Sequence, residues 1–363
     1  MIKITHIITG LNIGGAEKML YKLLQNMNEK NYKIEVIVLQ DKGFYGPKIE
    51  ELGIKVHEIK MKNIPRVKDI MKIRKLIKNA DVVQSWMYHA DLINYLATRF
   101  LKKKVIWGIR RTNLNKKENK KSTLLIAKLN ALLSRRANLV ISCSIAAKKT
   151  HINFGYSENK VIVIPNGFEM DKIYKDIVAR SEIRDEMEIE NKQVILSIGR
   201  WNIAKDHKNL IHAYKKVENT NTHLVLIGPN ITEDNVELIE IIKESKIKNY
   251  SLLGPQSNIN DYLSAADIYV SSSKSEGFPN VIGEAMACEL PCVVTDAGDS
   301  EYIVGDVGIT VPIENSEELA KGIEEMLSLT NEERKKLGKK SRKRIKDNFD
   351  IEVVAKMFEE QYY

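Results

Sequence analysis

The sequence contains little of several features that mark specialised protein classes. Its 363 residues include only three cysteines, Cys143, Cys288 and Cys292, an odd number without metal-ligand spacing. We therefore expect small buried thiols in a reducing compartment rather than a disulfide framework. No apolar run reaches the roughly 18 residues that a membrane-spanning helix needs. The first residues alternate like a buried strand and show no signal-peptide cleavage site, so a cytoplasmic protein is expected.

Other signals are also missing. We find no internal repeat and no low-complexity tract. No Asp-x-Asp pair is present, so we expect neither a metal ion nor another cofactor. The basic residues are not interleaved with aromatic side chains and form no known recognition motif, so nucleic acid is not an expected partner. What remains is a globular composition with 43% hydrophobic and 29% charged residues, in a chain long enough for two domains.

Acidic residues are scarce in the first half of the chain. Residues 1–170 carry 32 Lys and Arg against 13 Asp and Glu, whereas the remainder carries 25 against 35. The positive charge is densest at residues 102–136, where twelve basic residues accompany only Glu118. This asymmetry indicates an anionic partner for the first half.

Strand and helix signals alternate through most of the chain and begin again after a polar stretch at residues 171–192. The pattern predicts an α/β protein with two Rossmann-like, doubly wound domains that face each other across a cleft, with ligands beyond the carboxyl ends of the strands. We expect domains at residues 1–172 and 173–349, and a last helix at 350–363 that returns to the first domain. Predicted strands are 3–9, 34–39, 55–59, 81–86, 105–109, 139–142, 161–164, 194–198, 223–227, 250–253, 268–271 and 291–295, and predicted helices include 16–27, 67–78, 210–218, 236–246, 259–265 and 282–287.

The most informative segment is residues 276–284, which read Glu-Gly-Phe-Pro-Asn-Val-Ile-Gly-Glu. A Gly-Phe-Pro-Asn turn that opens a helix directs backbone N–H groups outward, and a helix start attracts phosphate. Glu276 precedes this anion site and Glu284 follows it. The arrangement suits a ligand with a central diphosphate and hydroxylated rings at both ends, such as a nucleotide-sugar.

Two further segments predict phosphate contacts. Residues 9–17, Thr-Gly-Leu-Asn-Ile-Gly-Gly-Ala-Glu, follow the first strand, but their spacing is not the G-x-G-x-x-G of a dinucleotide site, and a purely structural turn stays open. Arg200 follows Gly199 at the end of a strand, and Lys205 comes five residues later. A guanidinium and an ammonium there can hold a diphosphate and neutralise its departing charge.

These segments occur in the order found in retaining glycosyltransferases of family 4, which the chain resembles over almost its whole length. The resemblance rests on Gly14-Gly15-Ala16-Glu17, Ile164-Pro-Asn-Gly167, Gly199-Arg200 with Lys205, the run from Ala266 to Cys288, and Leu290 to Gly298. It implies the GT-B fold, with the acceptor bound by the first domain and the donor mainly by the second. One departure is Ile227-Gly-Pro-Asn-Ile231, where many relatives have Gly-x-Gly, so contacts of that loop are in doubt.

The resemblance also implies roles for individual residues. Arg200 and Lys205 would hold the donor diphosphate, Glu284 the ribose, and Glu276 the transferred sugar. The turn of Phe278, Pro279, Asn280 and Val281 would offer backbone N–H groups to the distal phosphate. Gly15 would approach the donor from the first domain, His89 would lie near the sugar, and residues 253–256 would hold the base. The leaving phosphate would deprotonate the acceptor on the same face, which retains configuration, and the basic side chains would replace a metal ion.

Other functions also fit parts of this pattern. Two carboxylates beside a sugar also fit glycoside hydrolysis, but the predicted phosphate contacts favour a phosphorylated donor. A nucleotide-sugar epimerase and a non-catalytic scaffold are the remaining alternatives. The expected function is transfer of a sugar from a nucleoside-diphosphate sugar to a glycan or lipid-linked saccharide, in the assembly of surface polysaccharide or glycoconjugate.

Residues 119–139 combine leucines at helical spacing with five cations, Lys120, Lys121, Lys128, Arg135 and Arg136. Such a helix can lie in an anionic headgroup layer, which predicts a peripheral protein at the inner face of the cell membrane. The alternative is that the leucines pack on the sheet and the cations are merely solvated.

Overall fold

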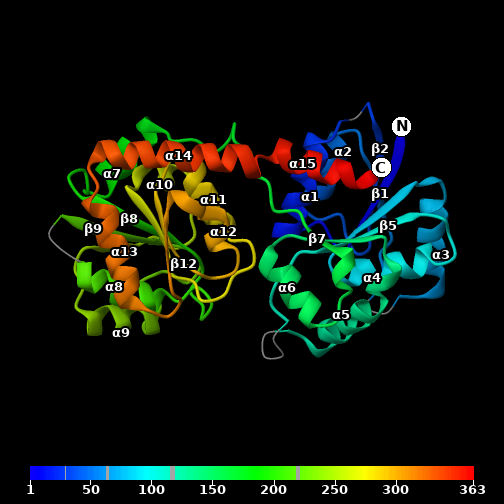
Figure 1. Ribbon diagram of the computed structural model, residues 1–363, viewed down its shortest axis with the longest axis horizontal. Helices are drawn as coiled ribbons and strands as arrows, with labels where there is room; N and C mark the ends of the chain where they lie inside the picture. The colour runs from blue at the N-terminus through cyan, green and yellow to red at the C-terminus, as the bar shows by residue number, and fades with distance from the viewer. Residues whose placement is uncertain (29, 63–64, 115–118, 218–220) are drawn as a thin grey trace. The chain divides into compact units, whose positions relative to one another are not determined.

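A computed structural model describes residues 1–28, 30–62, 65–114, 119–217 and 221–363 (Figure 1). The chain divides into two compact units. Unit 1 comprises Met1–Gly167 together with Ile351–Tyr363, and unit 2 comprises Phe168–Asp350. The sequence-based boundaries were 172/173 and 349/350. Each unit is built around one parallel sheet.

The sheet of unit 1 has seven strands in the order β3-β2-β1-β4-β5-β6-β7, and every pairing is parallel. The strands are β1 (Ile2–Ile8), β2 (Tyr32–Val38), β3 (Lys55–Glu58), β4 (Val82–Trp86), β5 (Lys104–Ile109), β6 (Leu139–Ser142) and β7 (Val161–Val163). Parallel strands need crossover helices, which cover both faces of such a sheet and explain its apolar strands.

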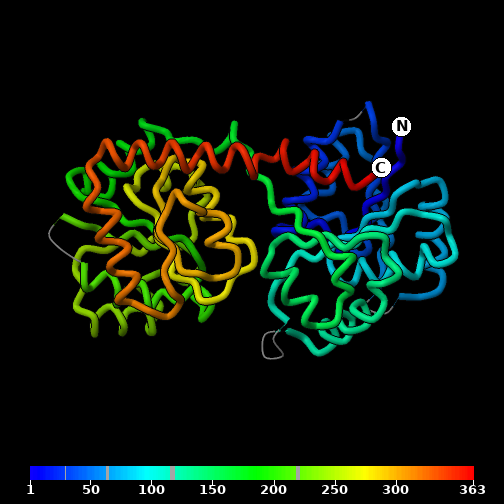
Figure 2. The backbone as a smooth tube through the Cα atoms, in the orientation of Figure 1, coloured from blue at the N-terminus to red at the C-terminus, as the bar shows by residue number. Residues whose placement is uncertain are grey.

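Two sets of helices cover the two faces of this sheet. One face packs on α1 (Gly15–Asn26), α2 (Tyr45–Glu51) and α15 (Ile351–Glu359). The other packs on α3 (Val67–Leu76), α4 (Tyr88–Thr98), α5 (Lys121–Leu133) and α6 (Ile145–Asn153). The tube view shows the C-terminal segment, in red, beside the blue segments that include α1 (Figure 2). Phe358 of α15 stacks on Trp86, with ring centroids 6.0 Å apart, so the end of the chain is part of this core.

The sheet of unit 2 has six parallel strands in the order β10-β9-β8-β11-β12-β13. They are β8 (Gln193–Ile198), β9 (Thr222–Ile227), β10 (Tyr250–Leu252), β11 (Ile268–Ser271), β12 (Cys292–Thr295) and β13 (Ile309–Val311). One face packs on α8 (His207–Val217), α9 (Val236–Ser245) and α13 (Ser316–Ser328), and the other on α10 (Ile259–Ala265), α11 (Asn280–Ala287), α12 (Ser300–Val304) and α14 (Asn331–Phe349). Helix α7 (Ile177–Glu186), which packs on α10, lies in the stretch expected to be a linker with a helix.

The predicted α/β class with two doubly wound parallel sheets is confirmed. In each sheet the strand order reverses between the first and fourth strands, at β1/β4 and at β8/β11. Ligands of open α/β sheets bind beyond the carboxyl ends of the strands at such a switch point. Four helices and strands of unit 2 were not among the predicted ones, namely α12, β13, α13 and α14. The three cysteines are buried, as expected.

Within the described ranges, no helix combines the length and the apolar character needed to cross a bilayer.

Candidate functional site

The switch point of unit 2 brings together two residues that are 71 positions apart in the chain. Lys205 follows β8 and Glu276 follows β11, and these strands are neighbours in the sheet. The Lys205 Nζ atom lies 2.6 Å from Glu276 Oε1. Both side chains are largely shielded, with exposed fractions of 24% and 14%. The predicted phosphate-binding and sugar-binding groups therefore meet at the sheet edge where a ligand is expected.

The Glu276 carboxylate has a second partner that fixes its orientation. Ser273 donates its hydroxyl hydrogen to the same Oε1 atom, at 2.7 Å. Because an ammonium has three N–H groups and a carboxylate about four acceptor positions, Lys205 and Glu276 can keep their contact and still bind a ligand. The ion pair is thus held in place, and both groups keep hydrogen-bonding capacity for a ligand.

The loop that carries Glu276 is braced by its neighbours. The Ser272 hydroxyl donates to the Lys205 carbonyl oxygen at 2.9 Å, which ties the two loops together. The Thr295 hydroxyl donates to the Ser273 carbonyl oxygen. Gly298 has φ of +64° and packs against Glu276, where a Cβ atom would lie 2.6 Å from the Glu276 carbonyl oxygen. Only glycine fits this close approach, so the loop has little freedom to shift.

The Gly-Phe-Pro-Asn turn opens α11, which starts at Asn280, two residues before the predicted start. Phe278 is buried against Phe168 and Phe349, with ring centroids 6.2 Å and 5.8 Å away. Gly283 leaves room for Phe168, since a Cβ atom there would lie 2.1 Å from that ring. The apolar motif residues therefore anchor the helix, and its N-terminal turn is positioned to attract an anion.

Glu284 lies farther along α11 and is partly exposed. Among the described residues its carboxylate has no hydrogen bond or ion pair, so it is available to a ligand. Arg200 is exposed, and its guanidinium likewise makes no hydrogen bond or ion pair with the described residues. No hydrogen bond or ion pair among the described residues joins either side chain to Lys205 or Glu276, and all four belong to unit 2.

Three loops at the carboxyl edge of this sheet are joined through their backbones. The Gly199 N–H donates to the carbonyl oxygen of Ile227, and the Gly228 N–H donates to the carbonyl oxygen of Gly254, each at 2.8 Å. Gly228 has φ of +149°, and a Cβ atom there would lie 2.2 Å from the Gly199 oxygen. The segment 228–230, which reads Gly-Pro-Asn where many relatives have Gly-x-Gly, thus keeps a glycine at the position where the packing requires one.

His207 supports the loop that carries Arg200 and Lys205. It is buried, it stacks on Trp201 with centroids 5.6 Å apart, and its Nε2 atom lies 3.3 Å from the Arg200 carbonyl oxygen. Burial lowers the pKa of His207 to about 4, so the ring is neutral at pH 7. Its contribution is to hold the loop rather than to supply charge.

In unit 1, Gly15 is the first residue of α1. A Cβ atom on Gly15 would meet nothing within 4 Å, so the fold of this unit leaves the space beside it open. At Gly14 a Cβ atom would lie 2.3 Å from the Glu17 carboxylate. That carboxylate is the end of a flexible side chain and can move away, so packing within the unit requires glycine at neither position, and the space at Gly15 is available to a ligand.

His89 lies at the carboxyl end of β4, beside the switch point of unit 1. Burial lowers its pKa, which keeps the imidazole neutral at pH 7. Met87, two residues earlier, has φ of +72° and ψ of 161°, a strained backbone for a residue with a side chain. Such strain concentrates at functional sites. The Asn130 amide of α5 donates to the Tyr88 carbonyl oxygen at 2.8 Å and braces this turn.

Helix α5 presents three of its leucines to solvent, whereas Leu124, Ile126 and Leu133 are partly buried. Leu125, Leu129 and Leu132 are 69%, 41% and 73% exposed, whereas the smaller Ala127 and Ala131 are buried. The five cations Lys120, Lys121, Lys128, Arg135 and Arg136 are all exposed. The predicted apolar stripe is therefore mainly on the outer face and not packed on the sheet. Lys116, Lys117 and Glu118 of the basic stretch lie outside the described residues.

Sequence reasoning missed Ser273, Thr295 and His207. A usable signal was the run of three serines at 271–273 at the end of an apolar strand, because buried hydroxyl groups need hydrogen-bond partners. The partners themselves come from other strands. Among the described residues, no three His, Cys, Asp or Glu side chains are grouped so that they could hold a metal ion.

Two family models match the chain, one on each unit. The model described as Glycosyltransferase Family 4 matches residues 13–172. The model described as Glycosyl transferases group 1 matches residues 179–344. The chain belongs to glycosyltransferase family 4. Its two units correspond to the two sequence models, so this glycosyltransferase contains both halves of the family pattern.

Individual proteins agree with this assignment. The glycosyltransferase is 27% identical over 343 residues to the N-acetylgalactosamine-N,N'-diacetylbacillosaminyl-diphospho-undecaprenol 4-alpha-N-acetylgalactosaminyltransferase of Campylobacter jejuni, with 90% of each chain covered. It is 25% identical over 292 residues to the capsular polysaccharide biosynthesis glycosyltransferase CapH of Staphylococcus aureus, covering 78% of this chain and 79% of CapH. The crystal structure of Anabaena Alr3699/HepE in complex with UDP superposes with a TM-score of 0.85 at 22% identity over 99% of both chains. The GT-B fold is thereby confirmed.

Proposed function

We propose that this glycosyltransferase transfers a sugar, with retention of configuration, from a nucleoside-diphosphate sugar to a saccharide acceptor that is carried on a lipid. Unit 2 would bind the donor and unit 1 the acceptor. The observation that carries the proposal is the Lys205–Glu276 pair, with 2.6 Å between Nζ and Oε1, at the switch point of unit 2. An ammonium, which can bind phosphate, lies there beside a carboxylate, which can accept hydrogen bonds from hydroxyl groups.

Each residue has a chemical task in this mechanism. Lys205 and Arg200 neutralise the charge that develops on the leaving diphosphate, and the N-terminal turn of α11 binds its distal phosphate. Glu276 accepts hydrogen bonds from hydroxyl groups of the transferred sugar, and Glu284 from the ribose. The bond between the anomeric carbon and the diphosphate oxygen breaks, the acceptor oxygen bonds to that carbon on the same face, and the leaving phosphate takes the proton of the acceptor hydroxyl. Lys205 and Arg200 supply the positive charge, so no metal ion is required.

The names of relatives support the class of acceptor. The Campylobacter jejuni relative is named for an undecaprenyl-diphosphate-linked saccharide, and CapH for capsular polysaccharide biosynthesis. A structural neighbour has been crystallised in complex with UDP-glucose. We extend these chemistries to this chain as a nucleoside-diphosphate sugar, a lipid-linked saccharide and a role in surface polysaccharide or glycoconjugate assembly.

A lipid-linked acceptor requires the enzyme to reach a membrane, and α5 offers a suitable surface. Its outer face has exposed Leu125, Leu129 and Leu132. Lys121 begins the helix and Lys128 is on it, Lys120 precedes it, and Arg135 and Arg136 follow. Such a face binds an anionic headgroup layer through both its charge and its apolar area. We propose peripheral association with the inner face of the cell membrane through α5.

The decisive experiment incubates the protein with a panel of nucleoside-diphosphate sugars and an undecaprenyl-diphosphate-linked saccharide. The donors are ranked beforehand by thermal shift, because a bound ligand raises the melting temperature by mass action. We expect one donor to yield an elongated lipid-linked product whose new linkage has the anomeric configuration of the donor, as read by NMR. Isomerisation of the donor without transfer, or an inverted linkage, would contradict the proposal.

A further inference from the structure

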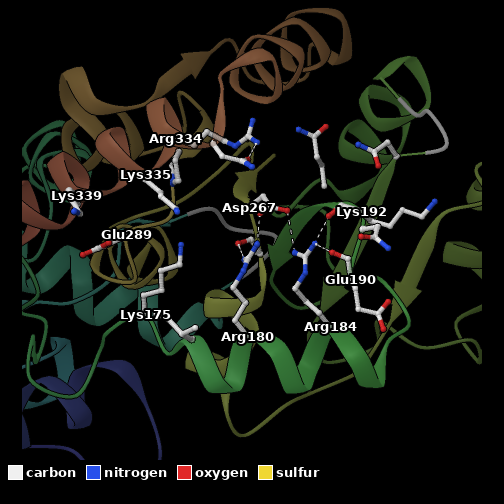
Figure 3. A pocket seen from close by; sticks show the side chains of 17 residues that line it. Lys175, Arg180, Arg184, Glu190, Lys192, Asp267, Glu289, Arg334, Lys335 and Lys339 are labelled. Carbon is white, nitrogen blue, oxygen red and sulfur yellow. Dashed lines mark hydrogen bonds and ion pairs between the residues drawn. The ribbon is translucent and has the colours of Figure 1, made fainter.

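A cavity of about 720 Å³ opens at the amino-terminal edge of the unit 2 sheet (Figure 3). Its lining includes Gln193 at the start of β8, Asp267 just before β11, and Pro291 just before β12. Lys205 and Glu276 lie beyond the opposite, carboxyl ends of these parallel strands. The cavity is therefore separate from the candidate donor site.

The lining of this cavity is strongly basic. It includes seven Lys and Arg residues against three Asp and Glu residues. The surrounding sequence has the opposite balance, because the part of the chain after residue 170 carries 25 basic and 35 acidic residues. The positive charge is thus concentrated in the cavity rather than typical of the unit, and a concave basic site attracts anions.

Two of the arginines make hydrogen bonds and ion pairs within the unit that explain their presence. Arg180 donates to the carbonyl oxygens of Ser264, Ala265 and Ala266, and it pairs with Asp267 at 2.6 Å. Arg184 also bonds to Asp267 and to the Ala265 carbonyl oxygen. These contacts satisfy the end of α10 and neutralise Asp267. The two arginines therefore need no ligand.

Three lysines of the cavity have no such structural role among the described residues. Among the described residues, the ammonium groups of Lys175, Lys335 and Lys339 make neither a hydrogen bond nor an ion pair. Figure 3 shows Lys175 and Lys335 entering from different walls with their ammonium groups directed toward each other. Burial and then the charge of Arg180 lower the pKa of Lys175, the charges of Glu289 and Asp267 oppose this, and Lys335 lowers it by a smaller amount. Lys175 and Lys335 thus lie close enough to repel each other.

Helix packing keeps two of these lysines at the cavity. Gly338 of α14 lies so close to Glu289 that a Cβ atom on it would be 2.1 Å from the Glu289 carbonyl oxygen. Lys335 and Lys339 flank this contact on the same helix. Because the helix is held here, neither lysine can leave the cavity by a shift of the backbone. Glu289 also lines the cavity, and its charge attracts Lys175 without forming an ion pair with any of the described lysines.

We propose that this cavity is a second binding site, for a ligand that carries phosphate groups held by the ammonium groups of Lys175, Lys335 and Lys339. Three ammonium groups offer nine N–H donors, which match the oxygen atoms of one or two phosphates. The volume is that of sites for ligands the size of a sugar phosphate or a nucleotide. This site goes beyond the proposed transfer reaction and does not depend on it.

The test is isothermal titration calorimetry with inorganic pyrophosphate at constant ionic strength. An Arg200→Ala/Lys205→Ala protein is used so that the donor site is disabled. We expect saturable binding that Lys335→Gln/Lys339→Gln weakens at least about tenfold, because two charged hydrogen-bond donors are lost. The matched control is Lys336→Gln/Lys340→Gln, which removes two exposed lysines of the same helix that do not line the cavity. It should leave the affinity nearly unchanged.

A second arm identifies the source of the phosphate. Both double variants are sedimented with vesicles of phosphatidylglycerol and phosphatidylcholine. A larger loss of vesicle binding for Lys335→Gln/Lys339→Gln than for the control assigns the site to a lipid headgroup, whereas a loss confined to pyrophosphate assigns it to a soluble phosphate. The proposal is overturned if pyrophosphate does not bind saturably, or if the two double variants lose affinity equally. Neither readout requires turnover, so failure here leaves the transfer reaction untouched.

Discussion

The ammonium of Lys205 and the carboxylate of Glu276 form an ion pair of 2.6 Å at the switch point of unit 2. Ser273 donates to the same carboxylate oxygen, so within the described part of the chain the second oxygen of Glu276 has no hydrogen-bond partner. In the protein without ligand, the pair keeps two charged groups in place and partly shielded from water. A donor that binds here meets groups that are already oriented, which reduces the reorganisation needed during the reaction.

The first prediction concerns the cations. Lys205→Ala and Arg200→Ala should each lower turnover by about 10²-fold or more, because each removes a charge that stabilises the leaving diphosphate. Turnover is measured at saturating donor, so that weaker binding does not mimic the effect. Lys208→Ala is the matched control, since Lys208 is an exposed lysine at the start of α8. Near-normal turnover in both site variants would refute the assignment.

The second prediction separates the two glutamates. Glu276→Ala should reduce transfer more than it reduces affinity for the free nucleoside diphosphate, because its proposed partner is the transferred sugar. Glu284→Ala should weaken both, because its proposed partner is the ribose. Affinity is measured by calorimetry and transfer by product formation. Equal losses of nucleoside-diphosphate affinity in the two variants would contradict the proposed orientation of the donor.

The third prediction concerns a buried carboxyl group in α4. Asp91 Oδ1 accepts hydrogen bonds from the Ser85 hydroxyl at 2.7 Å and from the Gly108 N–H at 3.2 Å, whereas Oδ2 has no partner among the described residues. Burial raises the pKa of Asp91 to about 8, against the smaller opposing effect of the two hydrogen bonds. The native protein therefore keeps this proton at pH 7, where an unfolded Asp has lost it.

Because the native state binds the extra proton, the contribution of Asp91 to the free energy of unfolding falls as pH rises from about 4 to about 8. The slope for one group is at most about 1.4 kcal/mol per pH unit. Asp91→Asn mimics the protonated form and lacks this slope. In urea unfolding, the stability of the variant relative to the wild type should therefore increase with pH and level off above about pH 8. Parallel pH profiles for the two proteins would show that Asp91 is ionised in the native state.

The fourth prediction concerns metal ions. Activity should survive treatment with EDTA, because Arg200 and Lys205 supply the positive charge that a metal ion would otherwise provide. Transfer is measured before and after chelation, and again after addition of Mg²⁺ or Mn²⁺. Complete loss on chelation with recovery on adding metal would show that a ligand set exists that we have not identified.

The fifth prediction concerns α5. Vesicle binding should require anionic lipid and decrease with salt, because each Lys or Arg near the surface contributes about 1 kcal/mol and is screened beyond a Debye length. Replacing Lys120, Lys121, Lys128, Arg135 and Arg136 with Gln should release the protein while transfer to a soluble acceptor analogue continues. Leu125→Ser/Leu132→Ser should remove a part of the binding that is insensitive to salt. If the wild type does not bind anionic vesicles at low salt, α5 is not a membrane surface.

Much of the fold could be predicted because the strands are short apolar segments separated by turn residues. The ranges 139–142, 259–265 and 268–271 agree with β6, α10 and β11 residue for residue. Helix α14 was missed for an identifiable reason. Its buried residues include Gly338, Ser341, Ile345 and Phe349, so the spacing is helical, but the first two side chains are not apolar. A search for hydrophobic periodicity does not detect a helix that packs through glycine and serine.

The sequence alone determined which chemical groups are present and where local structure begins. The turn at 276–284 opens a helix because of its own glycine, proline and asparagine, and this is a local property. Tertiary structure decided that Glu276 meets Lys205. Crossover connections allow β8 to pair with β11 as well as with β9, the next strand in the sequence, and this brings the two loops together. Tertiary structure also decided that α5 buries its alanines and exposes Leu125, Leu129 and Leu132. A helix with apolar residues on two faces does not reveal which face packs, because that depends on the space left by the elements beside it.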